Sequence, residues 1–164
     1  EGFEKGTVFL PQLLMSAEAA KTAFAVLKEK MDSSGEVQEK KGKIILATVK
    51  GDIHDIGKNI VKVLLENYRF DVIDLGKDVP PETIVDTVLE QDIHLVGLSA
   101  LMTTTVVSME ETIRQLREKA PDCLVMVGGA VLNQDYADMI GADFYGKDAM
   151  QSVHYAQRVF GTEE

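Results

Sequence analysis

Short runs of β-branched and aliphatic residues alternate with segments of helical periodicity along most of the chain. The runs, each about as long as one strand, cover residues 44–49, 71–75, 95–98, 124–127 and 142–145. The segments with helical spacing cover residues 58–68, 81–91, 106–119, 133–140 and 149–160. A helix after each of five strands is typical of a parallel, doubly wound sheet. Because crossovers between parallel strands are right-handed, we predict an α/β fold with a flavodoxin-like (Rossmann-like) five-stranded sheet in the order 2-1-3-4-5.

The first 43 residues follow a different pattern. From Pro11 onward, apolar residues fall three and four positions apart, as on one stripe of a helix, at Leu13, Ala17, Ala20, Phe24, Leu27 and Met31. Residues 32–43 are rich in charge and glycine, which is typical of a linker. We therefore expect a helical part over 1–31, a linker over 32–43 and an α/β domain over 44–164. Because residue 1 is Glu and the opening resembles the middle of a helix, we interpret the chain as a piece of a longer protein.

The composition narrows the classes of partner. With 27 acidic residues against 17 lysines and arginines, the formal net charge is −10, which repels nucleic-acid backbones and anionic lipids. No apolar run approaches the ~20 residues of a membrane span. The one cysteine, Cys123, excludes an intramolecular disulfide and a multi-cysteine zinc site. We predict a cytoplasmic protein with no nucleic-acid or membrane partner.

Ligands of doubly wound sheets bind beyond the carboxyl ends of the strands. The loops expected there cover residues 50–57, 99–105, 128–130 and 146–149, and they are rich in Gly, Ser, Thr, Asp and His. Such residues allow close approach of the backbone and offer many hydrogen bonds. The loops therefore suit a large polar ligand.

Three familiar functions of such sheets are disfavoured. A phosphate-binding P-loop needs four residues between its glycines and a Ser or Thr after its lysine. Here five residues separate Gly51 from Gly57, and Asn59 follows Lys58. The absence of G-x-G-x-x-G after the first strand weakens a dinucleotide site. A phosphorelay receiver needs an aspartate at the end of the third strand, where this chain has Ser99.

His54 lies two residues after Asp52 in the first of these loops. Imidazole is a common neutral metal ligand, and a carboxylate on its other nitrogen fixes the tautomer. One histidine cannot hold zinc, which takes three or four protein ligands, but it can fill an axial position of a metal held in a macrocycle. From these two residues alone, the alternative is that His54 only caps or solvates the chain.

Three motifs resemble those of cobalamin-binding domains. Residues 52–57 have the form D-x-H-x-x-G, Ser99-x-Leu101 follows the third predicted strand, and Gly128-Gly129 follows the fourth. The motifs occur in the order and at the strand ends at which that family has them, and the resemblance extends over nearly the whole chain. The chain is therefore similar to the cobalamin domains of methionine synthase and of corrinoid methyl-carrier proteins.

The resemblance implies a ligand proton relay beneath a bound cobalamin. His54 would be the axial ligand of cobalt, Asp52 would hydrogen-bond the other ring nitrogen, and the hydroxyl of Thr105 would complete the relay. Methionine synthase has a serine at the last position, so Thr105 keeps the hydroxyl and adds a methyl group.

The same comparison implies further contacts with the cofactor. These are Gly51 and Asp55 at the lower face of the corrin ring, Ser99 and Thr103 at a buried nucleotide tail, Gly57, Gly128 and Gly129 as room for that tail, Ala149 along the cofactor's edge, and Ile53 and Leu101 within the motifs. The first residues resemble the end of the helical cap of methyl carriers, in which Phe3, Leu10 and Leu13 would shield the methyl–cobalt bond. Ordinary core packing of these three residues is the alternative.

The function implied is that of a methyl carrier, using methylcobalamin and cob(I)alamin between partner methyltransferase domains. The first expectation is the methionine synthase type, with methyltetrahydrofolate as donor and homocysteine as acceptor. The alternative is a free-standing corrinoid protein of a methylamine, methanol or methoxyaromatic system. An isomerase domain is disfavoured by the cap fragment, and a cobalamin sensor by the lack of a visible DNA-binding region. The expected partners are methyl-donor and methyl-acceptor domains or subunits, with a reductive activation partner as a further expectation, so whether the chain is itself an enzyme stays open.

Overall fold

The computed structural model describes residues 19–23, 25–26, 29 and 40–162. Contacts within the chain divide it into two compact units, Glu1–Gln38 and Glu39–Glu164. The described residues of the first unit are helical, within the segment where the apolar spacing predicts a helix. The boundaries at residues 31 and 43 stay predictions, because most of the residues before 40 lie outside the described part.

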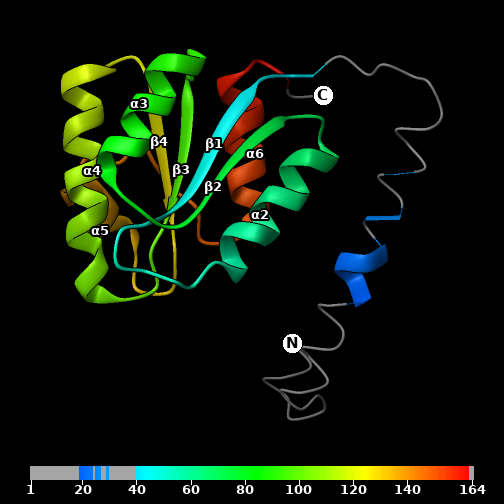
Figure 1. Ribbon diagram of the computed structural model, residues 1–164, viewed down its shortest axis with the longest axis horizontal. Helices are drawn as coiled ribbons and strands as arrows, with labels where there is room; N and C mark the ends of the chain where they lie inside the picture. The colour runs from blue at the N-terminus through cyan, green and yellow to red at the C-terminus, as the bar shows by residue number, and fades with distance from the viewer. Residues whose placement is uncertain (1–18, 24, 27–28, 30–39, 163–164) are drawn as a thin grey trace, which may run out of the picture. The chain divides into compact units, whose positions relative to one another are not determined.

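The second unit is built around a five-stranded parallel sheet (Figure 1). Its strands are β1 (Lys43–Val49), β2 (Asp71–Val79), β3 (Leu95–Ser99), β4 (Leu124–Gly128) and β5 (Phe144–Tyr145). They lie in the order β2-β1-β3-β4-β5, and every pair is parallel. The predicted order 2-1-3-4-5 is therefore confirmed.

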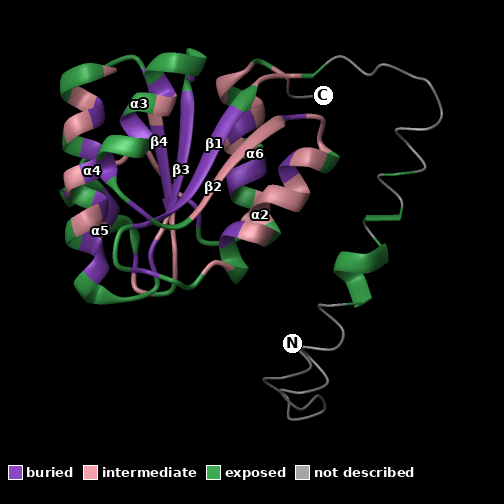
Figure 2. Cartoon of the chain, viewed as in Figure 1, coloured by how far each residue is buried: buried purple, intermediate pink, exposed green. Residues whose placement is uncertain are grey.

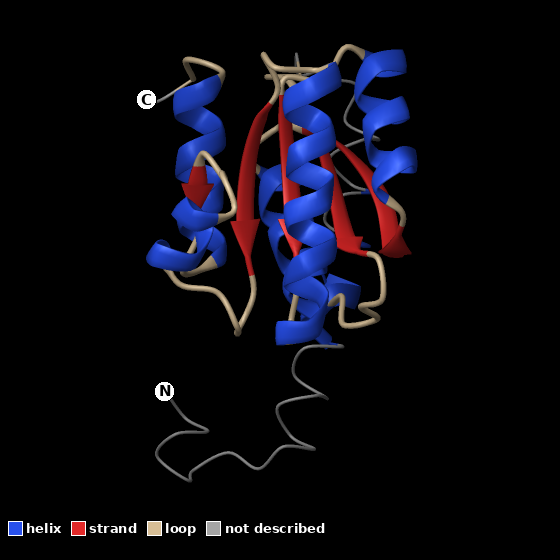
Figure 3. Cartoon of the chain, turned by 90° about the vertical axis from the view of Figure 1, so that its left-hand side faces the viewer, coloured by secondary structure: helices blue, strands red, loops and turns tan. Residues whose placement is uncertain are grey.

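Helices cover both faces of the sheet (Figure 3). They are α2 (Ile56–Asn67), α3 (Pro81–Gln91), α4 (Val106–Lys119), α5 (Gln134–Met139) and α6 (Ala149–Val159), with a 3₁₀ turn η1 (Thr103–Thr105) before α4. α2 packs beside α6 on one face, and α3 packs beside α4 on the other. The bounds of α3 and α4 coincide with the predicted ones, because each has an apolar stripe that is buried against the sheet.

Strand β1 is buried from Ile44 to Val49 and lies between β2 and β3 (Figure 2). Ile45, Ala47 and Val49 join the core under α3 and α4, whereas Ile44 and Leu46 join the core under α2 and α6. A strand that is covered on both faces has a continuous apolar sequence instead of an alternating one. This explains why the run Ile44–Val49 predicts a strand so clearly.

The two edge strands differ from the prediction. β2 continues to Val79, four residues beyond its predicted end, and its register against β1 shifts twice near Ala47. Gly76 and Asp78 have positive φ angles of 91° and 54°, so the strand is irregular there and its sequence resembles a loop. At the other edge, β5 is limited to Phe144–Tyr145.

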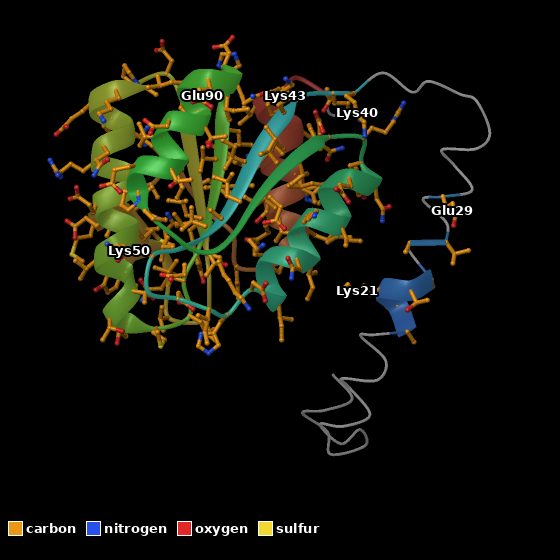
Figure 4. All side chains as sticks on the ribbon, in the orientation of Figure 1. Lys21, Glu29, Lys40, Lys43, Lys50 and Glu90 are labelled. Atoms are coloured by element: carbon orange, nitrogen blue, oxygen red, sulfur yellow. The ribbon has the colours of Figure 1, made fainter. Side chains whose placement is uncertain are left out.

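Labelled side chains in Figure 4 mark the two ends of the parallel strands. Lys43 and Glu90 lie at the amino-terminal end, where β1 starts and α3 ends, and Lys50 lies at the carboxyl-terminal end, just after β1 ends. Because all strands are parallel, Lys50 marks the end of the sheet at which a ligand is expected. Among the described residues, no helix combines the length and apolar character needed to cross a membrane.

Candidate functional site

A tight turn directly after β1 positions Asp52. The N–H of Asp52 donates to the carbonyl of Val49 at 3.0 Å, and Gly51, the third residue of this turn, has a φ of 86°. A positive φ at this position is typical of a type II turn, which favours glycine. Gly51, a contact residue that the resemblance implies, is therefore also favoured by the conformation of the turn.

The carboxylate of Asp52 is fully buried and is the centre of the site. Its Oδ1 accepts from the backbone N–H of His54 at 2.9 Å and lies 2.8 Å from Nδ1 of the same residue. Its Oδ2 accepts from the N–H of Leu101 at 2.7 Å and from the hydroxyl of Thr105 at 2.9 Å. Two loops that are far apart in sequence are thereby joined at one carboxylate.

These contacts determine the charge of Asp52. Burial by itself raises the pKa of the carboxyl, but the hydrogen bonds from Leu101, His54 and Thr105 together lower that pKa well below its usual range. Asp52 is therefore an anion in the folded protein at neutral pH. An anion beside Nδ1 favours the tautomer in which Nδ1 carries the proton.

His54 has one ring nitrogen bound and the other free to act as a ligand. Nδ1 faces Asp52, and 47% of the side chain is exposed. With Nδ1 protonated, the lone pair is on Nε2, the nitrogen that can bind a metal. In the part of the chain that the structure describes, no group of three His, Cys, Asp or Glu residues could hold a metal ion. The arrangement thus suits one axial position and not a metal held by the protein alone.

Thr105 is buried in η1 and extends the chain of polar contacts. Its hydroxyl lies 2.9 Å from Oδ2 of Asp52 and 2.8 Å from the carbonyl of Met102. The structure therefore brings together His54, Asp52 and Thr105, the three residues predicted for the relay.

A cavity of about 370 Å³ lies between the sheet and the helices α2 and α6, and its wall includes Gly57, three residues after His54. It has the size of a small-ligand pocket. Five of the predicted contact residues line it, namely Gly57, Ser99, Gly128, Gly129 and Ala149. A Cβ atom at Gly57 would meet no other heavy atom within 4 Å, and one at Gly128 would meet only the carbonyl of Gly146 at 3.5 Å. Side chains at these two positions would therefore extend into open space at the cavity.

Gly129 is needed for a close approach of two loops. Its φ is 142°, and a Cβ there would lie 1.7 Å from the carbonyl oxygen of Ala100. The loops after β3 and β4 can meet at this point only because residue 129 has no side chain.

The remaining predicted contacts lie elsewhere. Thr103 is exposed and does not line the cavity, because η1 leads into α4 on the opposite face of the sheet from α2. Gly51, Ile53 and Leu101 are exposed near His54, and Asp55 precedes α2 without a side-chain capping bond. Phe3, Leu10 and Leu13 lie outside the described residues.

Sequence reasoning did not identify Lys58 as part of the site. Lys58 lines the cavity and is buried, and its ammonium group pairs with Asp74 of β2. Burial raises the pKa of Asp74, but Lys58, the N–H of Gly76 and Lys62 lower it overall. A lysine in the first turn of a helix looks solvated in the sequence. The sequence does hold one indication of this pair. Asp74 lies within the apolar run 71–75, and a carboxylate in a strand that is covered by a helix needs a partner of opposite charge.

Comparisons with known proteins place the chain in a family. The family model described as "B12 binding domain" matches residues 42–154, and a second model with the same description matches residues 1–28. The chain belongs to the B12-binding family. Its cofactor is cobalamin, and the free Nε2 of His54 beside a cavity with room at Gly57 and Gly128 fits that cofactor.

This B12-binding chain is similar to corrinoid proteins over nearly its whole length. It is 41% identical to dimethylamine corrinoid protein 1 of Methanosarcina acetivorans, over 96% of this chain and 74% of that protein. A cobalamin-binding protein of Desulfitobacterium hafniense matches with a TM-score of 0.74 and 37% identity, over 96% of this chain and 74% of that one. The methanol:cobalamin methyltransferase complex of Methanosarcina barkeri matches with a TM-score of 0.74 and 33% identity, over 99% of this chain and 62% of that one. The chain is thus related to cobalamin methyl carriers, whereas the comparisons give no support to the methionine synthase type.

Proposed function

We propose that this chain carries a methyl group on cobalamin for a methylamine methyltransferase system. The observation that carries the proposal is the 41% identity to a dimethylamine corrinoid protein over 96% of the chain. This is the alternative that the motifs left open, and it replaces methyltetrahydrofolate and homocysteine as the expected donor and acceptor. The methanol system is the second candidate, supported by the similarity to the methanol:cobalamin methyltransferase complex.

In this proposal His54 would hold cobalt through Nε2. Cobalamin supplies a cobalt centre that accepts a methyl group from one substrate and gives it to another. Asp52 holds the ring of His54 through Nδ1, and Thr105 and the N–H of Leu101 hold Asp52. Because outer hydrogen bonds of this kind orient a ligand and set its basicity, the three residues act as one unit.

The same contacts favour one arrangement of His54. Asp52 remains ionised, since its hydrogen bonds keep its pKa well below the usual range, and it favours a proton on Nδ1. The side chain is half-exposed, so the ring can be reached without opening the core. The nitrogen that would bind cobalt is thus the one that Asp52 does not hold.

The cavity under α2 and α6 receives the nucleotide tail in this proposal. Ser99 offers a hydroxyl there, and Gly57, Gly128, Gly129 and Ala149 leave space. The match of a second B12-binding model to residues 1–28 supports a cofactor-binding role for residues 1–31, which would be a helical cap in which Phe3, Leu10 and Leu13 shield the methyl–cobalt bond. The partners are methyltransferase subunits for donor and acceptor. A net charge of −10 gives no support to a nucleic-acid partner.

The test is a methyl-transfer assay with the cobalamin-loaded chain in its reduced state. Purified methyltransferases for monomethylamine, dimethylamine, trimethylamine, methanol and methyltetrahydrofolate are each added with their substrate, and methylation of cobalt is followed by absorbance. We expect transfer with a methylamine enzyme. Transfer only from methanol would favour the second candidate, and transfer only from methyltetrahydrofolate would contradict both.

A further inference from the structure

The edge strand β2 contacts the turn that carries Asp52. The side chain of Asp78 accepts a hydrogen bond from the N–H of Gly51, with 2.7 Å between Gly51 N and Asp78 Oδ1. The backbone N–H of Asp78 donates to the carbonyl of Asp52 at 2.9 Å. One residue of β2 therefore holds Gly51, which precedes the D-x-H motif, and Asp52, which is its first residue.

The first of these bonds fixes one orientation of the turn. Type I and type II turns differ in ψ of the second residue and φ of the third, so they interconvert by rotation of the peptide between those residues. In this chain that peptide joins Lys50 to Gly51, and its N–H is the one that Asp78 accepts. Rotation would turn the N–H of Gly51 away from Asp78 and break the bond. Asp78 therefore favours the turn in which Gly51 has its φ of 86°.

The backbone of Asp78 is itself unusual. Among the residues that the structure describes, only Arg69, Asp78 and Asp92 have a positive φ without being glycine. The φ of 54° at Asp78 arises where β2 shifts register against β1. This conformation costs free energy for most residues and is tolerated best by Asn and Asp. It directs the carboxylate and the N–H of the same residue to the same turn.

We propose that Asp78 is a positioning residue for the axial histidine. It holds Gly51 and the carbonyl of Asp52, so the carboxylate of Asp52 stays within 2.8 Å of Nδ1 of His54. This inference rests on the proposed role of His54 as cobalt ligand. It adds a residue that none of the three motifs contains.

The test uses the full chain, labelled with ¹⁵N-histidine and loaded with cob(II)alamin. Electron paramagnetic resonance then distinguishes a nitrogen of His54 from the ¹⁴N of the cofactor's own base. Asp78→Gly removes the acceptor and keeps the positive φ without strain. We expect about a tenfold fall in the ratio of His54-bound to His54-free cobalt, at the low end of the ~10–100-fold effects of outer-shell partners.

Two further variants separate this role from a general loss of order. Asp78→Asn keeps an acceptor oxygen and tolerates the positive φ, so it retains the parent ratio. Asp92→Gly makes the same substitution at a φ of 52°, at the C-cap of α3 before β3 starts, and also retains it. A parent-like ratio in Asp78→Gly, or an equal loss in Asp92→Gly, would overturn the inference.

A measurement without cobalamin keeps the two proposals distinguishable. In the unloaded chain, ¹⁵N nuclear magnetic resonance reports which ring nitrogen of His54 carries the proton. We expect mostly the Nδ1–H tautomer in the parent and a smaller share in Asp78→Gly. An unchanged share would overturn the role of Asp78, whereas absence of ¹⁵N coupling in the loaded parent would overturn the axial role of His54.

Discussion

The ammonium nitrogen of Lys58 lies 2.5 Å from Oδ1 of Asp74, so a buried ion pair joins the first turn of α2 to the edge strand β2. The Lys58 side chain is only 2% exposed. Lys62 lies farther away, with 3.5 Å to Oδ2 of the same aspartate. The start of α2 forms one wall of the cavity, and this ion pair stabilises its position in addition to apolar packing.

Replacing Lys58 by Met should destabilise the fold through Asp74, which would lose its nearest cation. We expect the free energy of unfolding to fall by about 3 kcal/mol, the scale for breaking a buried pair from one side. Urea unfolding followed by circular dichroism measures it. The matched control is Arg114→Met, which breaks exposed pairs with Glu111 and Glu118 and should cost less than about 1 kcal/mol. Equal losses in the two variants would contradict this account of Lys58.

Asp52→Asn should change how stability depends on pH in the cobalamin-free chain. The folded pKa of Asp52 is lowered from its usual 3.8, so its contribution is fully present above that pH and is lost as the pH falls through the folded pKa. We expect the variant to be less stable by about 2 kcal/mol at neutral pH, since its amide would face the donor N–H of Leu101.

The difference between Asp52→Asn and the parent should narrow steadily below pH 4, because the carboxyl group of Asp52 then binds a proton in the unfolded chain while it is still ionised in the folded one. Chemical unfolding at a series of pH values shows this, with Asp86→Asn on the exposed side of α3 as the control. A difference that stays constant down to pH 2 would argue against ionised Asp52 as the cause.

His54→Ala should separate axial ligation from retention of the cofactor. The variant loses Nε2, so the absorption spectrum of the loaded chain should lose the features of histidine-bound cobalt. Contacts in the cavity of about 370 Å³ should still retain part of the cobalamin. A spectrum identical to that of the parent would show that another group binds the metal.

Gly128→Val should reduce the room in the cavity without affecting His54. The new side chain starts only 3.5 Å from the carbonyl of Gly146 and extends into space that the nucleotide tail would occupy. We expect cobalamin to bind at least about tenfold more weakly, which is ~1.4 kcal/mol. Cobinamide, which lacks the tail, should bind the variant and the parent equally. Isothermal titration with both corrinoids provides the comparison, and equal weakening of the two would contradict a tail site.

The sequence predicted the fold well where apolar spacing is regular. The bounds of α3 and α4 agree with the structure because each helix buries one stripe, and β1 is recognised because both of its faces are covered. The end of β2 was missed, since Gly76 and Asp78 with positive φ resemble a loop and become a strand only through pairing with β1. Such pairing depends on residues some 30 positions away, which local patterns do not report.

The site was predicted in part. The family resemblance identified His54, Asp52 and Thr105, which the structure brings together, and five residues that line the cavity. Lys58 was missed because its burial depends on Asp74, sixteen positions later. The resemblance implied that Thr103 contacts the nucleotide tail, which stays a prediction, and Thr103 lies in η1 and is not among the residues that line the cavity. The methyl donor could not be predicted from the motifs, because the methionine synthase type and the free-standing corrinoid proteins share them.

The residues that hold His54 connect it to two neighbouring strands that differ in how they are covered. On one side is β1, whose amides from Ile44 onward are buried, and on the other is the edge strand β2, which has a neighbour on one side only. Local opening of a protein starts where fewest contacts resist it, so hydrogen exchange should be slow along β1 and faster at the end of β2. Fraying of that edge would release the turn while the core stays folded, and the domain would gain a low-energy motion at the turn that holds Asp52 and His54.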